Sequence, residues 1–334
     1  MKNFKCKCGQ VLIFENTKCL SCGFGVGFDP YRMKMRRVEN KLLGQKISRA
    51  STLHRCRNSL DYDVCNWLVN DPASEYCLSC ELNHTIPNLL EPSRRAWWKS
   101  LEYAKRRLIY SLLSLNLPVV GKKDDPTGLA FKFKEDQRTN PKVIEKHVNT
   151  GHLDGMITIN ITEADSVRSE IARQNSRYLY RTLLGHFRHE SGHYYFLKLI
   201  NTEERKRQFR QLFGDERQDY AAALKKYYKN SSHAPHDPDM ISHYAQSHPW
   251  EDWAEVWAHY LHMIDTLDTA NQYRLRQSSA QFDNIDITLE KWGELTLLLN
   301  SLNRSMGLED AYPFVLSDLS FTKLRFVHGL IYPS

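Results

Sequence analysis

The residues best suited to chemistry lie together in the middle of the chain, in the segment His189-Glu190-Ser191-Gly192-His193. If this segment is helical, histidines four positions apart share one helix face and can place two imidazoles on one zinc ion. Glu190 would then reach a metal-bound water and act as the general base of a hydrolysis. Flanking apolar residues at helical spacing favour the helix, and Gly192 would let another segment approach closely. The alternative is a polar helix face whose histidines bond to neighbouring backbone.

A catalytic zinc of this kind needs a third protein ligand and one open position for water. The candidate is Glu251, because Pro249 suits the first turn of a second helix that begins just before it. Glu255, one turn later on the same face, would accept the free N–H of a ligating histidine and orient its ring. Glu251 could instead serve only to stabilise the N-terminus of its helix. Glu255 and His259 are then the alternative ligands.

The eight cysteines all precede residue 81 and fall into two groups of four. Two cysteines separated by two residues can direct both thiolates at one ion, so each group predicts a zinc site. Four cysteine ligands leave no position open for catalysis, and we therefore expect both ions to be structural. His54 or His84 could replace a cysteine in the second, more widely spaced group. The first group consists of Cys6, Cys8, Cys19 and Cys22, and the second of Cys56, Cys65, Cys77 and Cys80.

The composition is that of an ordinary globular protein, with 334 residues, 41% hydrophobic and 25% charged. The net charge of +7 permits an acidic partner but does not require one. No apolar run approaches the roughly 20 residues that a membrane helix needs. The N-terminus runs directly into a cysteine group without the apolar core of a signal peptide. We therefore expect a cytoplasmic protein that keeps its thiols reduced and has no membrane partner.

These motifs must be positioned by two expected domains that together form an α+β fold. Residues 1–90 would form a zinc-binding module of the ribbon or knuckle type. Residues 91–334 would form a mainly helical, zincin-like domain with a small β-sheet. Apolar spacing predicts a long helix over residues 93–117 that ends at Pro118.

Further elements are predicted on both sides of the histidine motif. Alternation predicts strands at residues 131–134 and 157–161. The second strand could be a sheet edge that binds an extended substrate, or an ordinary core strand. Helices are expected near residues 287–305 and 321–330.

The pattern His189-Glu190-x-x-His193 with Glu251-x-x-x-Glu255 resembles the gluzincin metallopeptidases. Tyr244, seven residues before Glu251, looks like the tyrosine of the lethal-factor arrangement, and the resemblance implies that it steadies the tetrahedral intermediate. His243 and His248 are weaker candidates for that role. Most of the chain resembles a bacterial family of zinc-binding metallopeptidases with an N-terminal zinc ribbon. The matching stretches are residues 14–16, 65–69, 104–108, 180–190 and 248–252.

The residues and the resemblance together predict a zinc-dependent metallopeptidase that hydrolyses a peptide or isopeptide bond. It would hold one catalytic and two structural zinc ions, and its partner would be a peptide or protein substrate. The alternative is an adaptor that binds nucleic acid or protein through its zinc ribbons and keeps a degenerate zincin scaffold. Aromatic residues among basic ones, at residues 97–99 and 103–107, allow this alternative but suit a core-facing helix better.

Overall fold

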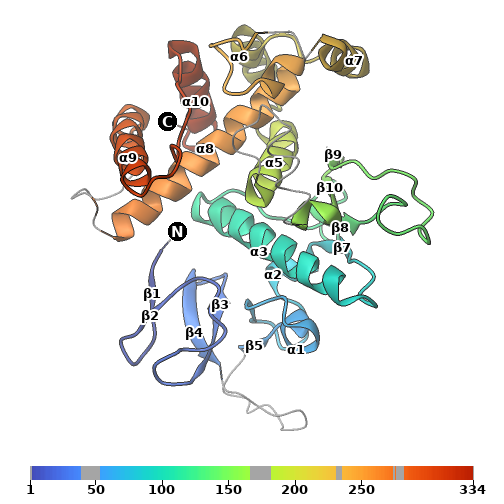
Figure 1. Cartoon of the computed structure of the whole chain (residues 1–334), viewed down its shortest axis with the longest axis vertical. Helices are drawn as coiled ribbons and strands as arrows, with labels where there is room; N and C mark the ends of the chain where they lie inside the picture. The colour runs from blue at the N-terminus through green and yellow to red at the C-terminus, as the bar shows by residue number, and fades with distance from the viewer. Residues whose placement is uncertain are drawn as a thin grey trace. The chain divides into compact units, whose positions relative to one another are not determined.

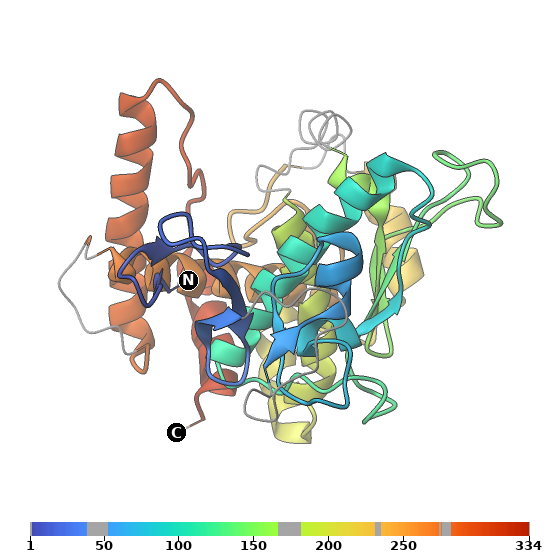
Figure 2. The ribbon, with the colours of Figure 1, turned by 90° about the horizontal axis from the view of Figure 1, so that it is seen from below.

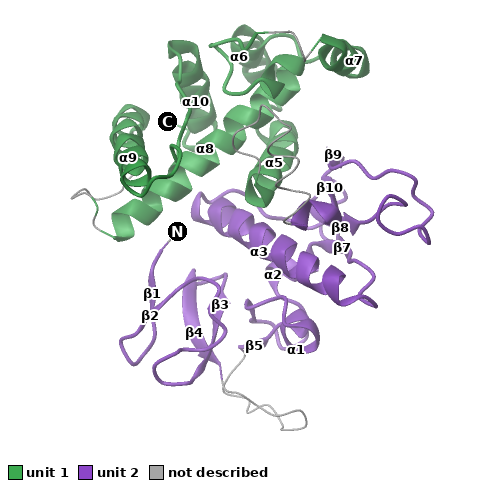
Figure 3. Ribbon diagram, viewed as in Figure 1, with its two compact units in different colours: residues 1, 170–334 green, residues 2–169 purple. Residues whose placement is uncertain are grey.

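The computed structural model describes residues 2–38, 53–165, 182–230, 235–273, 275 and 282–333. The chain divides into two compact units, residues 2–169 and residues 1 and 170–334, which are described separately here (Figure 3). The first unit carries short strands and one longer helix, and the second is helical (Figure 1). This arrangement confirms the predicted α+β fold class. Residues 180–181 of the stretches quoted above lie outside the described residues.

Two antiparallel strand pairs frame the first cysteine group. β1 (Phe4–Lys5) pairs with β2 (Val11–Leu12), and β3 (Gly25–Asp29) pairs with β4 (Lys34–Val38). Gly9 and Gly23 follow cysteines and have φ angles of +92° and +74°, which residues with a Cβ rarely adopt. These two glycines therefore allow the tight turns that direct the thiolates of the group toward one point.

The second cysteine group is built from equally short elements. β5 (His54–Arg55) pairs with β6 (Leu68–Val69), and two cysteines directly precede helices, Cys56 before α1 (Arg57–Tyr62) and Cys77 before α2 (Leu78–Glu81). A cluster of buried aromatic rings provides the apolar core of this part. Its centroid distances are 4.9 Å for Phe14–Phe28, 5.0 Å for Phe28–Trp67 and 5.3 Å for Phe14–Tyr110.

A four-stranded sheet completes the first unit, in the order β7-β8-β10-β9. β10 (Met156–Asn160) pairs in parallel with β8 (Ala130–Lys134) and antiparallel with β9 (Gly151–Leu153). The hypothesis that this segment is a sheet edge is therefore wrong, because its backbone hydrogen bonds are directed to strands on both sides. Ile157 and Ile159 are fully buried, as the core-strand alternative requires.

The predicted long helix is present as α3 (Pro92–Ser114), which ends before the predicted end at residue 117, and it packs within the first unit. β7 (Asn83–Thr85) pairs in parallel with β8, so the sheet joins residues on both sides of position 90. The buried Lys105 of α3 bonds to Asn83 and Glu102 and adds to this connection. α3 and the sheet therefore lie in the same compact unit as the two cysteine groups.

The second unit is organised around α8 (Pro249–Gln272), which packs on α5 (Leu183–Leu199) and α10 (Asp318–Ile331). Figure 2 shows α9 (Ile285–Ser305) as the upright orange-red helix of this unit, beside α8. The helices predicted near residues 287–305 and 321–330 are thus present. The remaining elements are α6 (Glu203–Phe213), α7 (Tyr220–Asn230) and the 3₁₀ turn η2 (Tyr244–Ser247). Among the described helices, none has the length and apolar character that crossing a bilayer would require.

α5 approaches α8 closely at Gly192, as the sequence predicted. A Cβ at this position would lie 3.0 Å from the Cα of Ala254 and 3.1 Å from Cδ1 of Trp257. The indole of Trp253 donates to the carbonyl of Gly192 at 2.8 Å, and that of Trp257 donates to the hydroxyl of Ser191 at 3.1 Å. The two indoles therefore fix the separation of the helices.

We expect Gly192→Ala to lower the free energy of unfolding by about 1–3 kcal/mol, because an added methyl group overpacks this contact. Gly293→Ala on α9 is the matched control, since no described atom lies within 4 Å of its added Cβ. Alanine also favours a helix over glycine, so the control should be neutral or stabilising. Denaturant unfolding followed by tryptophan fluorescence measures both variants. Equal stability of the two would contradict the close approach.

Candidate metal centre

The N-termini of two helices set the positions of the site residues. α5 begins after Thr182, whose hydroxyl accepts the backbone N–H of Gly185 at 3.0 Å. α8 begins at Pro249, and Nδ1 of the preceding His248 accepts the backbone N–H of Trp250 at 3.1 Å. Proline fits this position because the first turn leaves its N–H groups unpaired in any case. The acids of the first turn of α8 then lie beside the middle of α5.

Three residues, His189, His193 and Glu251, converge between α5 and α8, and together they are called the metal group. One nitrogen of each ring and one carboxylate oxygen lie within 4.8 Å of one another. Oε2 of Glu251 is 2.9 Å from Nε2 of His189 and 3.6 Å from Nε2 of His193. Glu251 is only 1% exposed, and a carboxylate so deeply buried needs a compensating positive charge. The structure thus brings together the three residues that were predicted as ligands.

Glu255 contacts the other side of the His189 ring, with its Oε1 2.7 Å from Nδ1. Burial would lower the pKa of His189, but hydrogen bonds to Glu251 and Glu255 outweigh it and raise that pKa well above its usual value. Burial would likewise raise the pKa of Glu251, yet the bonds to His189 and His193 hold it well below its usual range. The carboxylates therefore favour positive charge between the helices, which a divalent cation can supply in place of a proton.

Glu190 lies next to His189 on α5 and is 8% exposed. Its Oε2 is enclosed and, within the described part of the chain, meets no hydrogen-bond donor. Burial raises the pKa of Glu190, and the nearby charge of Glu251 acts in the same direction. A buried carboxylate oxygen of this kind can accept a proton from a small molecule held at the adjacent metal group.

Two tyrosines border the same group. The ring of Tyr244 lies 5.9 Å from that of His189, and the hydroxyl of Tyr220 donates to Oε1 of Glu251 at 2.6 Å. Burial, and then the charge of Glu251, raises the pKa of both hydroxyls, so both remain proton donors at neutral pH. Tyr220 was not among the predicted site residues. No spacing rule connects it to Glu251, which lies 31 residues later in the chain.

The other histidines considered for this site have different partners. Nδ1 of His243 bonds to the hydroxyl of Tyr227 at 2.8 Å, and Nε2 of His248 bonds to the carbonyl of Gln218 at 3.2 Å. His259, an alternative ligand, forms a hydrogen bond of 2.7 Å through Nε2 with the hydroxyl of Tyr312. His259 is not part of the group that converges on Glu251.

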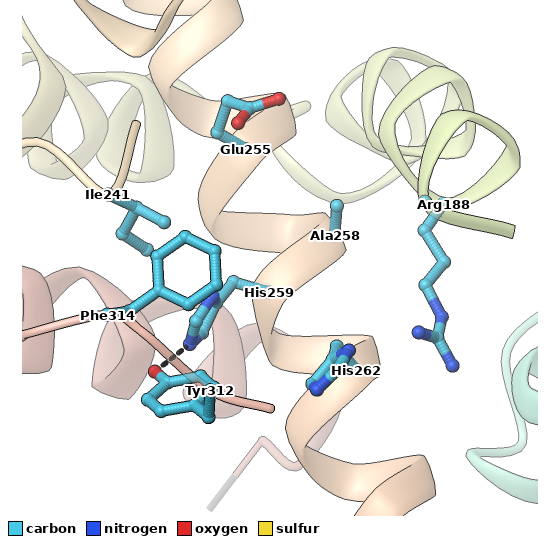
Figure 4. A pocket seen from close by; sticks show the side chains of 9 residues that line it. Arg188, Ile241, Glu255, Ala258, His259, His262, Tyr312 and Phe314 are labelled. Carbon is cyan, nitrogen blue, oxygen red and sulfur yellow. Dashed lines mark hydrogen bonds between the residues drawn. The ribbon is translucent and has the colours of Figure 1, made fainter. Parts of the chain in front are cut away.

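A small cavity of about 30 Å³ lies along α8 beyond Glu255 (Figure 4). Its volume suits a water molecule rather than a substrate side chain. Burial lowers the pKa of His259, which lines it, to about 4. Its other lining residues are Gly185, Arg188, Ile241, Ala258, His262, Tyr312 and Phe314.

The cysteines form the two predicted groups, and within each group the sulfurs lie within 4.8 Å of one another. The separations of Cys6 from Cys22 and of Cys65 from Cys77 are both 3.6 Å. Four sulfurs at 2.3 Å from a tetrahedral zinc would be about 3.8 Å apart, whereas disulfide-bonded sulfurs are about 2.05 Å apart. The spacing therefore fits two thiolate cages.

The surroundings of the cysteine groups settle two open alternatives about their ligands. His54 bonds to the carbonyl of Ser74 at 3.0 Å, and the exposed His84 bonds to Thr85, so neither replaces a cysteine. The backbone N–H of Cys8 and then the guanidinium of Arg37 lower the pKa of the Cys6 thiol to about 6, which favours a thiolate.

The donor sets fit zinc in both of its usual forms. Two imidazoles and one carboxylate match a catalytic site that keeps a fourth position open, and four thiolates match a closed structural site. The buried Oε2 of Glu190, which meets no donor among the described residues, is consistent with the first form.

Lys105 and Arg106 belong to the stretch of basic and aromatic residues at 103–107. Their side chains are buried in the first unit, where Lys105 bonds to Glu102 and Arg106 bonds to the carbonyl of Val64.

Comparison with known proteins gives the class to which this fold and site belong. Residues 94–330 match the family described as "Putative zinc-binding metallo-peptidase", and residues 3–91 match a zinc-ribbon domain. The chain belongs to this metallo-peptidase family. It is similar to the uncharacterized proteins Mb2598c of Mycobacterium bovis and Rv2568c of Mycobacterium tuberculosis, each 40% identical over 342 residues that cover 99% of this chain and 95% of theirs. No solved structure matches the chain.

We expect the purified chain to contain three zinc ions and Glu251→Ala to contain two, because the variant loses one of the three donors between α5 and α8. Glu290→Ala, at an exposed position on α9, is the control and should retain all three. Elemental analysis against protein concentration measures the content. A full complement in Glu251→Ala would show that this carboxylate is not a ligand.

The low pKa of His259, about 4 in the folded chain, predicts a loss of stability in acid. The pKa of a histidine in an unfolded chain is about 6.5, so between the folded and unfolded pKa values the unfolded chain binds more protons than the folded chain. The contribution of neutral His259 to the free energy of unfolding is therefore fully present above pH 6.5 and falls by about 2 kcal/mol by pH 5. Denaturant unfolding from pH 7 to pH 5 should give a shallower pH dependence for His259→Gln than for the unsubstituted chain. Metal release affects both proteins alike, so identical slopes would contradict the prediction.

Proposed function

We propose that this protein is a zinc-dependent metallopeptidase that hydrolyses a peptide or isopeptide bond. The observation that carries the proposal is the convergence of His189, His193 and Glu251 on one point beside the buried carboxylate of Glu190. Membership of the metallo-peptidase family supports the same reaction class. The substrate is a peptide or protein, since the reaction requires a scissile amide.

The proposed ligands of the catalytic zinc are His189, His193 and Glu251. Bound there, zinc acts as a Lewis acid that lowers the pKa of water to about 7 and polarises a carbonyl group. Glu255 holds the His189 ring by accepting its Nδ1–H, which leaves Nε2 directed at Glu251 and the ligand group. The two cysteine groups would hold two further, structural ions, because four thiolates leave no position open.

Glu190 is the proposed general base. It takes a proton from the attacking water as the new C–O bond forms, and it delivers that proton to the leaving nitrogen as the C–N bond then breaks. The burial that raises its pKa moves the carboxylate toward the range in which it can both accept and donate a proton near neutral pH. Its enclosed oxygen is not engaged by the described part of the protein and is thus available for this transfer.

Tyr244 is the proposed donor to the developing oxyanion. Its ring lies beside that of His189, 5.9 Å between centroids, and its hydroxyl keeps its proton because burial raises its pKa. A single hydrogen-bond donor in such a position can contribute roughly 3 kcal/mol of transition-state stabilisation.

We expect Glu190→Gln to keep its full zinc content but to lose hydrolysis by at least about 100-fold, the usual contribution of a general base. A peptide library and isopeptide-linked model peptides, read by mass spectrometry, would reveal cleavage by the unsubstituted chain. Glu290→Gln is the control for the substitution itself. Undiminished cleavage by Glu190→Gln would remove the proposed base, and loss of zinc would show that the residue acts on the metal group instead.

A further inference from the structure

α7 contacts Glu251 through the side chain of its first residue, Tyr220, and its packing on the rest of its unit is unusual for a helix. None of its residues, Tyr220 to Asn230, is buried, and its principal packing contact is with η2. Helices of globular proteins are held mainly by burying an apolar face. α7 lacks that source of stability and must depend on specific polar contacts.

Two tyrosine hydroxyls supply such contacts. Tyr220 donates to Oε1 of Glu251 at 2.6 Å, and Tyr227 bonds to Nδ1 of His243 at 2.8 Å. The two tyrosines are seven positions apart and thus lie on the same face of the helix. The Tyr220 ring also packs against His248, 5.2 Å between centroids, and the Tyr227 ring packs against Tyr244 at 5.9 Å. One of these contacts of α7 is therefore with the proposed zinc ligand itself.

The Tyr220 bond also determines how Glu251 presents its carboxylate. Oε2 faces His189 and His193, at 2.9 Å and 3.6 Å, whereas Oε1 is occupied by the Tyr220 hydroxyl. With Oε1 held in this way, the carboxylate offers a single oxygen to an ion between the histidines. Without the hydroxyl, the carboxylate could rotate and present either oxygen.

We propose that Tyr220 is a positioning residue that couples the docking of α7 to metal binding at His189, His193 and Glu251. This inference rests on the proposed role of these three residues as zinc ligands. Because coupling between two sites is reciprocal, docked α7 strengthens metal binding and bound metal strengthens the docking of α7.

Tyr220→Phe tests the coupling because it removes only the hydroxyl. We expect a competing chelator to remove the third zinc ion at a concentration about 10- to 100-fold lower than for the unsubstituted chain, the usual effect of removing a hydrogen-bond partner of a metal ligand. Hydrogen exchange gives a second readout that does not depend on hydrolysis. In the unsubstituted chain, zinc should protect the amides of α7, and in Tyr220→Phe zinc should leave their exchange unchanged.

Two further variants separate this effect from a general loosening of the helix. Tyr227→Phe removes the other attachment, so α7 should exchange faster with and without zinc, but zinc should still slow the exchange. Tyr273→Phe, at an exposed position after α8, should behave as the unsubstituted chain does. The inference would be overturned if Tyr220→Phe bound zinc with unchanged affinity and if zinc still protected the amides of α7 in that variant.

These measurements use zinc alone and are independent of the reaction. If Glu190→Gln cleaves as well as the unsubstituted chain, the proposed base is wrong, while the coupling can still be observed. If Glu251→Ala keeps its third ion, the proposed ligand set is wrong, and the proposed coupling through Tyr220 is then wrong as well. Each outcome therefore identifies which of the two proposals has failed.

Discussion

The metal group depends on the close contact between α5 and α8 at Gly192. The missing side chain lets the helix backbones approach, and the indoles of Trp253 and Trp257 then bond across the gap to the Gly192 carbonyl and the Ser191 hydroxyl. Rigid indoles in a close-packed interior leave little freedom for the separation of the helices. That separation in turn sets the distance between the histidines of one helix and the glutamates of the other.

The acidic residues at the start of α8 are a second constraint on the site. The carboxylates of Glu251 and Glu255 both face His189, and the group as a whole favours a cation. The neighbouring Asp252 is directed elsewhere, to a buried ion pair with Lys323 of α10 at 2.7 Å. This pair neutralises the third acid of the first turns of α8 and ties the turn to α10. The acids that face the histidines are therefore Glu251, the proposed ligand, and Glu255, which holds the His189 ring.

The N-terminal part of the first unit meets a different constraint, a shortage of apolar core. Many of its strands are only two residues long, and such elements cannot stabilise one another by pairing alone. Two groups of four converging cysteines and a cluster of aromatic rings bring these short elements together. Positive charge accompanies the cages: Nη2 of Arg37 lies 3.8 Å from Cys6 and 3.7 Å from Cys22, and Arg106 is buried near the second group.

Several features of this protein can be read from short stretches of its sequence. The histidines at i and i+4, the cysteine spacings and the presence of the long helix α3 follow from local geometry, and the structure brings the histidines and cysteines together as that geometry requires. Tertiary packing alone decided that β10 lies inside the sheet, that His259 turns to Tyr312, and that Tyr220 reaches Glu251. The reason is that local hydrogen bonding and side-chain periodicity are fixed by neighbours in the chain. Contacts between distant segments depend instead on how whole helices and strands pack, which no short stretch of sequence specifies.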